Sequence, residues 1–87
     1  MDINIEQLKK KIIYRSSYRG TREMDKLLGS FTKKYIDELE IKDLVDLEKL
    51  LNFDDNNLYS FYINEKTDID FETNKVNSLF KNFKYSE

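Results

Sequence analysis

The chain has 87 residues, enough for one domain with a modest core, and it contains no proline, no cysteine and no histidine. Without cysteine and histidine it has no disulfide, thiolate nucleophile, imidazole base or histidine-containing zinc or haem site, so an enzyme is not expected. The net charge of −2 hides an asymmetry: residues 1–35 carry nine basic and four acidic residues, and residues 36–87 carry six basic and thirteen acidic ones.

The first helix is predicted from about residue 5 to about residue 16. Ile5, Leu8 and Ile12 recur at the spacing that places side chains on one helical face. We expect this face to be buried and the lysines between these positions to be solvated.

A second helix is predicted to begin near Gly20 or Thr21, and it has the strongest helical pattern in the chain. Its core face consists of Met24, Leu27, Leu28, Phe31 and Tyr35. Gly29 lies inside this helix, where glycine costs about 1 kcal/mol relative to alanine. Close approach of a neighbouring helix is the expected reason for it.

Three shorter helices follow in the acidic part of the chain. One is predicted from about residue 41 to 52, with a buried face of Leu44, Leu47, Leu50 and Leu51. Asp54 or Asp55 can cap a fourth helix, which buries Leu58, Phe61 and Tyr62. A fifth follows a polar loop and buries Val76, Leu79, Phe80 and Phe83. The expected fold is therefore all-α, a small five-helix bundle forming a single domain over residues 1–87.

The acidic clusters do not match a calcium-binding loop, which needs glycine at its sixth position and glutamate at its twelfth. Counting from Asp54, the sixth residue is Tyr59, and counting from Asp68, the sixth and twelfth are Thr73 and Leu79. Two glycines also cannot build a phosphate-cradling loop. We expect this chain to bind no metal and no flavin by itself.

The stretch from Tyr14 to Leu28, YRSSYRGTREMDKLL, is richer in exposed chemistry than a helix start requires. Gly20 as N-cap and Glu23 as half of a capping box would explain two residues. The arginines are not explained in this way, because cations are unfavourable near a helix N-terminus. The residues that need another explanation are Arg15, Tyr18, Arg19 and Arg22.

Two kinds of partner could explain this stretch. Tyrosine and arginine are enriched at protein interface hot spots, and a glycine among them lets a partner's backbone come close. Basic residues mixed with tyrosines would also suit single-stranded nucleic acid, as in a small helical regulator or antitoxin-like protein. The pI near 5.2 and the acidic second half argue against a polyanion, so we favour a protein partner.

The ends and the hydropathy of the chain predict its location. The start MDINIEQLKKKII has neither an uninterrupted apolar segment nor the composition of a transit peptide, and no apolar run approaches membrane-spanning length. We therefore expect a soluble, monomeric protein of the cytoplasm that contacts no membrane.

The motif YRGTREMD followed by LLGSF resembles the RGxxE signature of the FAD assembly factor family, the succinate dehydrogenase flavinylation factors known in bacteria as SdhE. The later stretch LEKLLNFDDNNLYSFYI looks like the second conserved block of that family. The resemblance runs collinearly from about Ile12 to Ile63. Asp54, Asp55 and Leu58 match within the second block and are assigned to structure.

This resemblance implies an assembly chaperone rather than an enzyme. Such a factor binds the flavoprotein subunit of succinate dehydrogenase and promotes covalent attachment of FAD to that partner, with fumarate reductase a further candidate client. The signature corresponds to Arg19, Gly20 and Glu23, with Asp25 just beyond it, and the resemblance places these residues on the surface that meets the flavoprotein. Arg15 and Arg22 flank them as auxiliary contacts.

Overall fold

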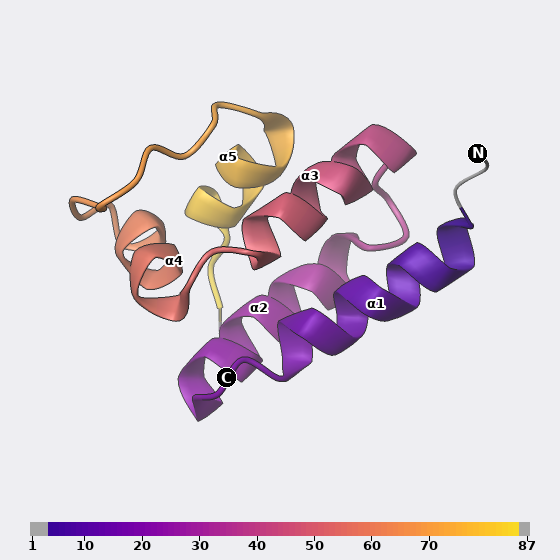
Figure 1. Ribbon diagram of the computed structural model, residues 1–87, viewed down its shortest axis with the longest axis horizontal. Coiled ribbons are helices and arrows are strands. Elements are labelled where there is room, and N and C mark those ends of the chain that lie inside the picture. Colours follow the sequence, from indigo (N-terminus) through magenta and orange to yellow (C-terminus); the bar gives the residue numbers. More distant parts are fainter. Residues whose placement is uncertain (1–3, 86–87) are drawn as a thin grey trace.

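The computed structural model describes residues 4–85, and helix is the only regular secondary structure among them. The helices are α1 (Ile5–Ser17), α2 (Arg22–Tyr35), α3 (Ile41–Leu51), α4 (Asp55–Tyr62) and α5 (Lys75–Asn82). Figure 1 shows α1 and α2 as an antiparallel pair, with α3 packed on α1 and α5 between α3 and α4. The prediction of an all-α five-helix fold is confirmed.

Polar residues at the helix starts accept hydrogen bonds from backbone N–H groups that have no partner within the helix. Asn4, Thr21, Asp54 and Asn74 cap their helices in this way. The predicted cap of the second helix was wrong in detail. Thr21, and not Gly20, accepts from the backbone of Met24, which puts Glu23 at the second helical position, where a capping box cannot form.

One apolar cluster holds the helices together, and every helix contributes to it. Its fully buried side chains include Ile12, Leu28, Phe31, Leu44, Leu47, Leu50, Leu51, Leu58, Val76 and Phe80. The predicted core faces of the second and third helices are buried, with Tyr35 half-buried. Ile5 is an exception, exposed because the first turn of α1 lies at the edge of the bundle (Figure 1).

Gly29 lies where α2 passes the C-terminal turn of α1. A Cβ atom at this position would lie 3.6 Å from the Ser17 hydroxyl oxygen and 3.9 Å from the carbonyl oxygen of Ser16. A neighbouring helix does lie close to Gly29, as predicted, but at distances that would also accommodate alanine, so the close approach does not by itself require glycine. None of the helices in the described range is long and apolar enough to span a membrane.

Candidate functional site

The turn between α1 and α2 has Gly20 at its apex. Its φ of +115° lies in a region that residues with a side chain rarely adopt, so the backbone itself requires glycine here. A Cβ atom would have no neighbour within 4 Å. The glycine therefore faces open space, and a substitution would project a side chain outward from the protein.

Arg19 turns inward from this turn instead of toward solvent. Its Nε donates to Oδ1 of Asp55 at 2.9 Å, and its two terminal nitrogens donate to the carbonyl oxygens of Leu51 and Phe53 at 2.7 and 2.8 Å. Only a tenth of the side chain is exposed. The expectation of a surface guanidinium at Arg19 was therefore wrong. The planar guanidinium turns inward because it can donate to the carbonyl oxygens of Leu51 and Phe53, at and just after the end of α3, which lack a partner within the helix.

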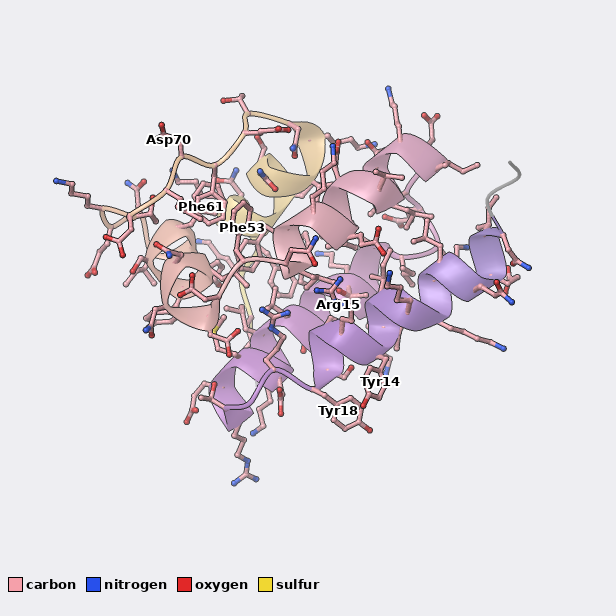
Figure 2. All side chains as sticks on the ribbon, in the orientation of Figure 1. Tyr14, Arg15, Tyr18, Phe53, Phe61 and Asp70 are labelled. Atoms are coloured by element: carbon pink, nitrogen blue, oxygen red, sulfur yellow. The ribbon has the colours of Figure 1, made fainter. Side chains whose placement is uncertain are left out.

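Arg15 and Asp25 fix the same turn from either side. The Arg15 guanidinium donates to the side-chain oxygen of Asn52, the C-cap residue directly after α3. Figure 2 shows Arg15 pointing from α1 toward α3. The Asp25 carboxylate accepts the backbone N–H of Arg19. Two of the three arginines thus lie at the negative end of the α3 dipole, where cations are favourable.

Tyr18, Arg22 and Glu23 are the predicted site residues that remain exposed. Tyr18 is 71% exposed, and its ring lies 4.8 Å, centre to centre, from the ring of Tyr14, which is 65% exposed. Figure 2 shows both rings on the outer side of α1. These three residues, together with the apex glycine, are the part of the predicted site that a partner could touch directly.

A groove of about 320 Å³ lies beside the start of α2. Met24 and Leu27 supply apolar surface from α2, and Tyr59, Tyr62 and Tyr85 line it from α4 and the C-terminal segment. The Tyr62 hydroxyl donates to the carbonyl oxygen of Phe83 at 2.6 Å and so holds that segment against α4. The charged residues that line the groove are Arg22, Glu23 and Lys26.

Sequence reasoning missed this groove. It brings α2 together with residues of α4 and of the C-terminal segment, and helical periodicity reports only which face of a helix is buried. The one signal in the sequence was a large aromatic residue, Tyr59, outside the predicted buried face of the fourth helix; the structure shows it 49% exposed. Arg22 and Glu23 thus belong both to the turn and to the groove, whose other side is formed by residues distant in the sequence.

The side chains around the groove have the chemistry of a docking surface. No group of acidic, histidine or cysteine side chains among residues 4–85 could hold a metal ion. The pKa of Asp54 is lowered by hydrogen bonds from the side chain and backbone of Asn57, as expected for a carboxylate that caps a helix. The groove has a mainly apolar lining with charged groups beside it, an arrangement typical of a docking surface.

Comparison with known proteins gives a consistent family assignment. The family model described as "Flavinator of succinate dehydrogenase" matches residues 10–84. Succinate dehydrogenase assembly factor 2, mitochondrial, of Dictyostelium discoideum is 39% identical over 71 residues, which cover 79% of this chain and 50% of that protein. The protein of the same name from Lodderomyces elongisporus is 34% identical over 55 residues, covering 63% of this chain and 34% of its own.

A third relative, succinate dehydrogenase assembly factor 2-A, mitochondrial, of Drosophila mojavensis, is 28% identical over 89 residues. That match covers 99% of this chain and 57% of the relative. The chain thus spans between a third and three fifths of the curated relatives that it matches. No solved structure matches it significantly.

Proposed function

The chain belongs to the family of flavinators of succinate dehydrogenase, as the motif resemblance predicted, and on this premise we propose that it is an assembly factor for that enzyme. It binds the flavoprotein subunit and promotes covalent attachment of FAD to it. The family match carries this proposal, because it runs from residue 10 to residue 84 and so includes the turn, the groove-lining part of α4 and nearly all of the core. The names of the curated relatives support the same role.

The site residues divide into two groups under this proposal. Tyr18, Arg22 and Glu23 meet the flavoprotein, and Gly20 lets its backbone approach the apex of the turn. The other predicted residues hold the turn in place, and they are Arg15, Arg19 and Asp25. Support for this division comes from exposure: the first group faces solvent, whereas the guanidinium of Arg19 is satisfied inside the chain.

The proposed factor is not itself an enzyme, and the FAD belongs to the partner. The groove volume of about 320 Å³ is at the low end for small-molecule pockets, and no glycine-rich phosphate loop lies beside it. These features support contact with an amino-acid side chain of the partner rather than with a dinucleotide. The bond-forming groups, the flavin ring and a histidine, would then both be held by the flavoprotein.

We also propose a location, a second client and an oligomeric state for this chain. The curated relatives have "mitochondrial" in their names, so the cytoplasmic location expected from the start of the chain has no support from them. A monomer and a second client, fumarate reductase, remain our predictions. The nucleic-acid-binding alternative gains nothing from the family match or from the relatives' names.

Coexpression with the flavoprotein subunit of succinate dehydrogenase tests the proposal. The host cells should lack their own assembly factor, and covalent flavin is read as in-gel fluorescence of the denatured flavoprotein. We expect fluorescence with the wild-type chain and a strong loss with Gly20→Arg. Gly20→Ala is the matched control, because both variants strain the backbone at φ +115° but only arginine adds bulk at the apex.

Circular dichroism melting shows whether each variant is folded. A folded Gly20→Arg chain that binds the flavoprotein and restores covalent flavin as well as Gly20→Ala would contradict docking at the turn. Absence of covalent flavin with the wild-type chain, despite a folded flavoprotein and sufficient FAD, would contradict the proposed function itself.

A further inference from the structure

Three large apolar side chains on the second half of α1 and at its C-cap are exposed, and two of them are in contact. We define the α1 strip as Ile13, Tyr14 and Tyr18, which are 46%, 65% and 71% exposed. The two tyrosines are one helical turn apart, and their ring centres lie 4.8 Å apart with the planes tilted by 36°. Figure 2 shows both rings beside each other and directed away from the other helices.

The strip is organised in advance for binding. Two rings in contact on a helix restrict each other's rotamers, so less conformational entropy is lost when a partner covers them. Tyrosine is also among the residues that contribute most to interface affinity when they are desolvated. None of the contacts within the fold requires Tyr14 or Tyr18 to be aromatic, since the tyrosines lie outside the apolar core cluster.

The three lysines in the middle of α1 differ in whether they form ion pairs within the fold. Lys9 and Lys11 form ion pairs with Asp37 and Glu48 at 3.2 and 2.8 Å. Lys10 is exposed, precedes Tyr14 by one helical turn, and forms no ion pair within the described range. Glu6, one helical turn before Lys10, is also exposed and without an ion pair among residues 4–85, so Lys10 is an unpaired cation one turn from Tyr14 with an acidic residue one turn further from it.

A second exposed cation lies across the helix pair. Gly29 of α2 faces Ser17 of α1, and the two helices are antiparallel (Figure 1). Lys33, one turn beyond Gly29, therefore lies level with Ile13, one turn before Ser17. Lys33 is exposed and, like Lys10, has no ion pair in the part of the chain that the structure describes.

The turn by itself offers too little surface for stable docking. A standard protein interface buries about 800 Å² per partner and involves about 20–30 residues a side. The exposed part of the predicted site is the apex glycine with Tyr18, Arg22 and Glu23. The groove beside α2 supplies part of the further surface that a stable complex must cover. Tyr14, whose ring is in contact with that of Tyr18, extends the exposed surface on the other side of the turn.

We propose that the α1 strip is a second docking surface for the same flavoprotein, covered by an apolar patch of that partner that carries carboxylates around it. This inference rests on the proposed function and extends it by adding Ile13 and Tyr14, with Lys10 and Lys33 facing the acidic groups. Carboxylates of the partner pair with Lys10 and Lys33, and its apolar surface covers Ile13 and the rings of Tyr14 and Tyr18.

Binding measurements on the full chain test this surface. The flavoprotein subunit of succinate dehydrogenase is immobilised, and the Kd of each variant is measured by biolayer interferometry. We expect Tyr14→Ala to weaken binding at least tenfold, because truncation of a hot-spot tyrosine removes more binding energy than the roughly 1.4 kcal/mol that corresponds to a factor of ten in Kd. Alanine is the best helix former, so α1 should remain intact. Ile41→Ala, at the start of α3 and 42% exposed, is the matched control and should bind within twofold of wild type.

The charge component has its own pair of variants. Lys10→Glu should weaken binding about fivefold at low salt and less at high salt, because exposed charges are screened. Lys42→Glu, an exposed lysine on α3, should have a much smaller effect. A wild-type chain in complex should also show shifted or broadened methyl resonances of Ile13, which tests the surface without any substitution.

Each failure has a distinct signature. Wild-type binding to the flavoprotein combined with unchanged Kd for Tyr14→Ala and unshifted Ile13 methyl signals overturns the second surface and leaves the proposed function standing. Absence of any wild-type binding overturns the proposed function. If Tyr14→Ala binds the flavoprotein normally but loses low-salt retention of a single-stranded oligonucleotide, the strip binds nucleic acid and the inference is overturned.

Discussion

Nε of Arg19 lies 2.9 Å from Oδ1 of Asp55, an ion pair that joins the turn between α1 and α2 to the first turn of α4. The side chains are 10% and 23% exposed. The same guanidinium donates to the backbone carbonyl oxygens of Leu51 and Phe53, so one side chain connects the turn to the end of α3 and to the start of α4. The arginine of the RGxxE signature is thus a structural centre of the site.

Arg19→Ala should lower the free energy of unfolding by about 2–3 kcal/mol, because it leaves Asp55 and two carbonyl oxygens without their charged donor. For a domain of this size, that corresponds to a fall in Tm of roughly 10–20 °C. Arg22→Ala is the matched control: Arg22 is exposed, and its loss should change stability by less than about 0.5 kcal/mol. Thermal melting followed by circular dichroism gives both values, and equal melting points would refute the structural assignment.

Glu23→Ala separates docking from helix capping. The carboxylate is exposed and lies at the second position of α2, so its removal should cost no more than about 0.5 kcal/mol through the helix dipole. Thr21→Ala, which removes the actual cap, should cost about 1 kcal/mol. We expect the reverse order in flavoprotein binding, measured as Kd. A Glu23 variant that melts earlier than the Thr21 variant would favour a structural role for the glutamate.

The two glycines should respond to alanine in opposite ways. Gly29 lies inside α2 with room for a Cβ atom at ordinary contact distance, so Gly29→Ala should stabilise the protein by about 0.5–1 kcal/mol. Gly20 has a φ of +115°, so Gly20→Ala should destabilise it by at least about 1 kcal/mol. Urea unfolding of both variants measures the difference. A loss of stability in the Gly29 variant would mean that α1 and α2 cannot adjust around Ser17.

Asp54 should make α4 sensitive to acid. Hydrogen bonds from Asn57 lower the pKa of this carboxyl in the folded chain, so the ionised cap stabilises the fold above the ordinary aspartate pKa of about 3.9. That contribution is lost as the pH falls through the lowered folded pKa. Asp54→Asn keeps a capping side chain and should flatten the dependence of Tm on pH below about pH 4.5.

Asp70→Asn, at an exposed carboxylate in the loop before α5, is the control for this titration and should leave the dependence as in wild type. The measurement is Tm between about pH 2.5 and pH 6. Equal curves for wild type and Asp54→Asn would show that the cap contributes nothing to the acid response.

Much of the fold could be predicted because helical periodicity is a local property. The spacing of Met24, Leu27, Leu28 and Phe31 reports directly which face of α2 is buried, and all four are buried. Asp54 was likewise one of two predicted caps, since a short acidic side chain before a helix accepts free N–H groups. The cap of α2 was misassigned because Gly20 and Thr21 are both acceptable cap residues, and only the left-handed backbone at Gly20 separates them.

The helices, their core faces and the family motif could be predicted from the sequence, because each depends on residues close together in the chain. Which of the arginines remain exposed depends on the tertiary structure. Arg15 and Arg19 reach residues more than thirty positions away, at the C-terminal end of α3, where a cation is favourable. In the sequence, all three arginines lie near the predicted start of the second helix, where a cation is unfavourable. The packing of α3 against α1 resolves this for two of them and leaves Arg22 exposed beside the groove.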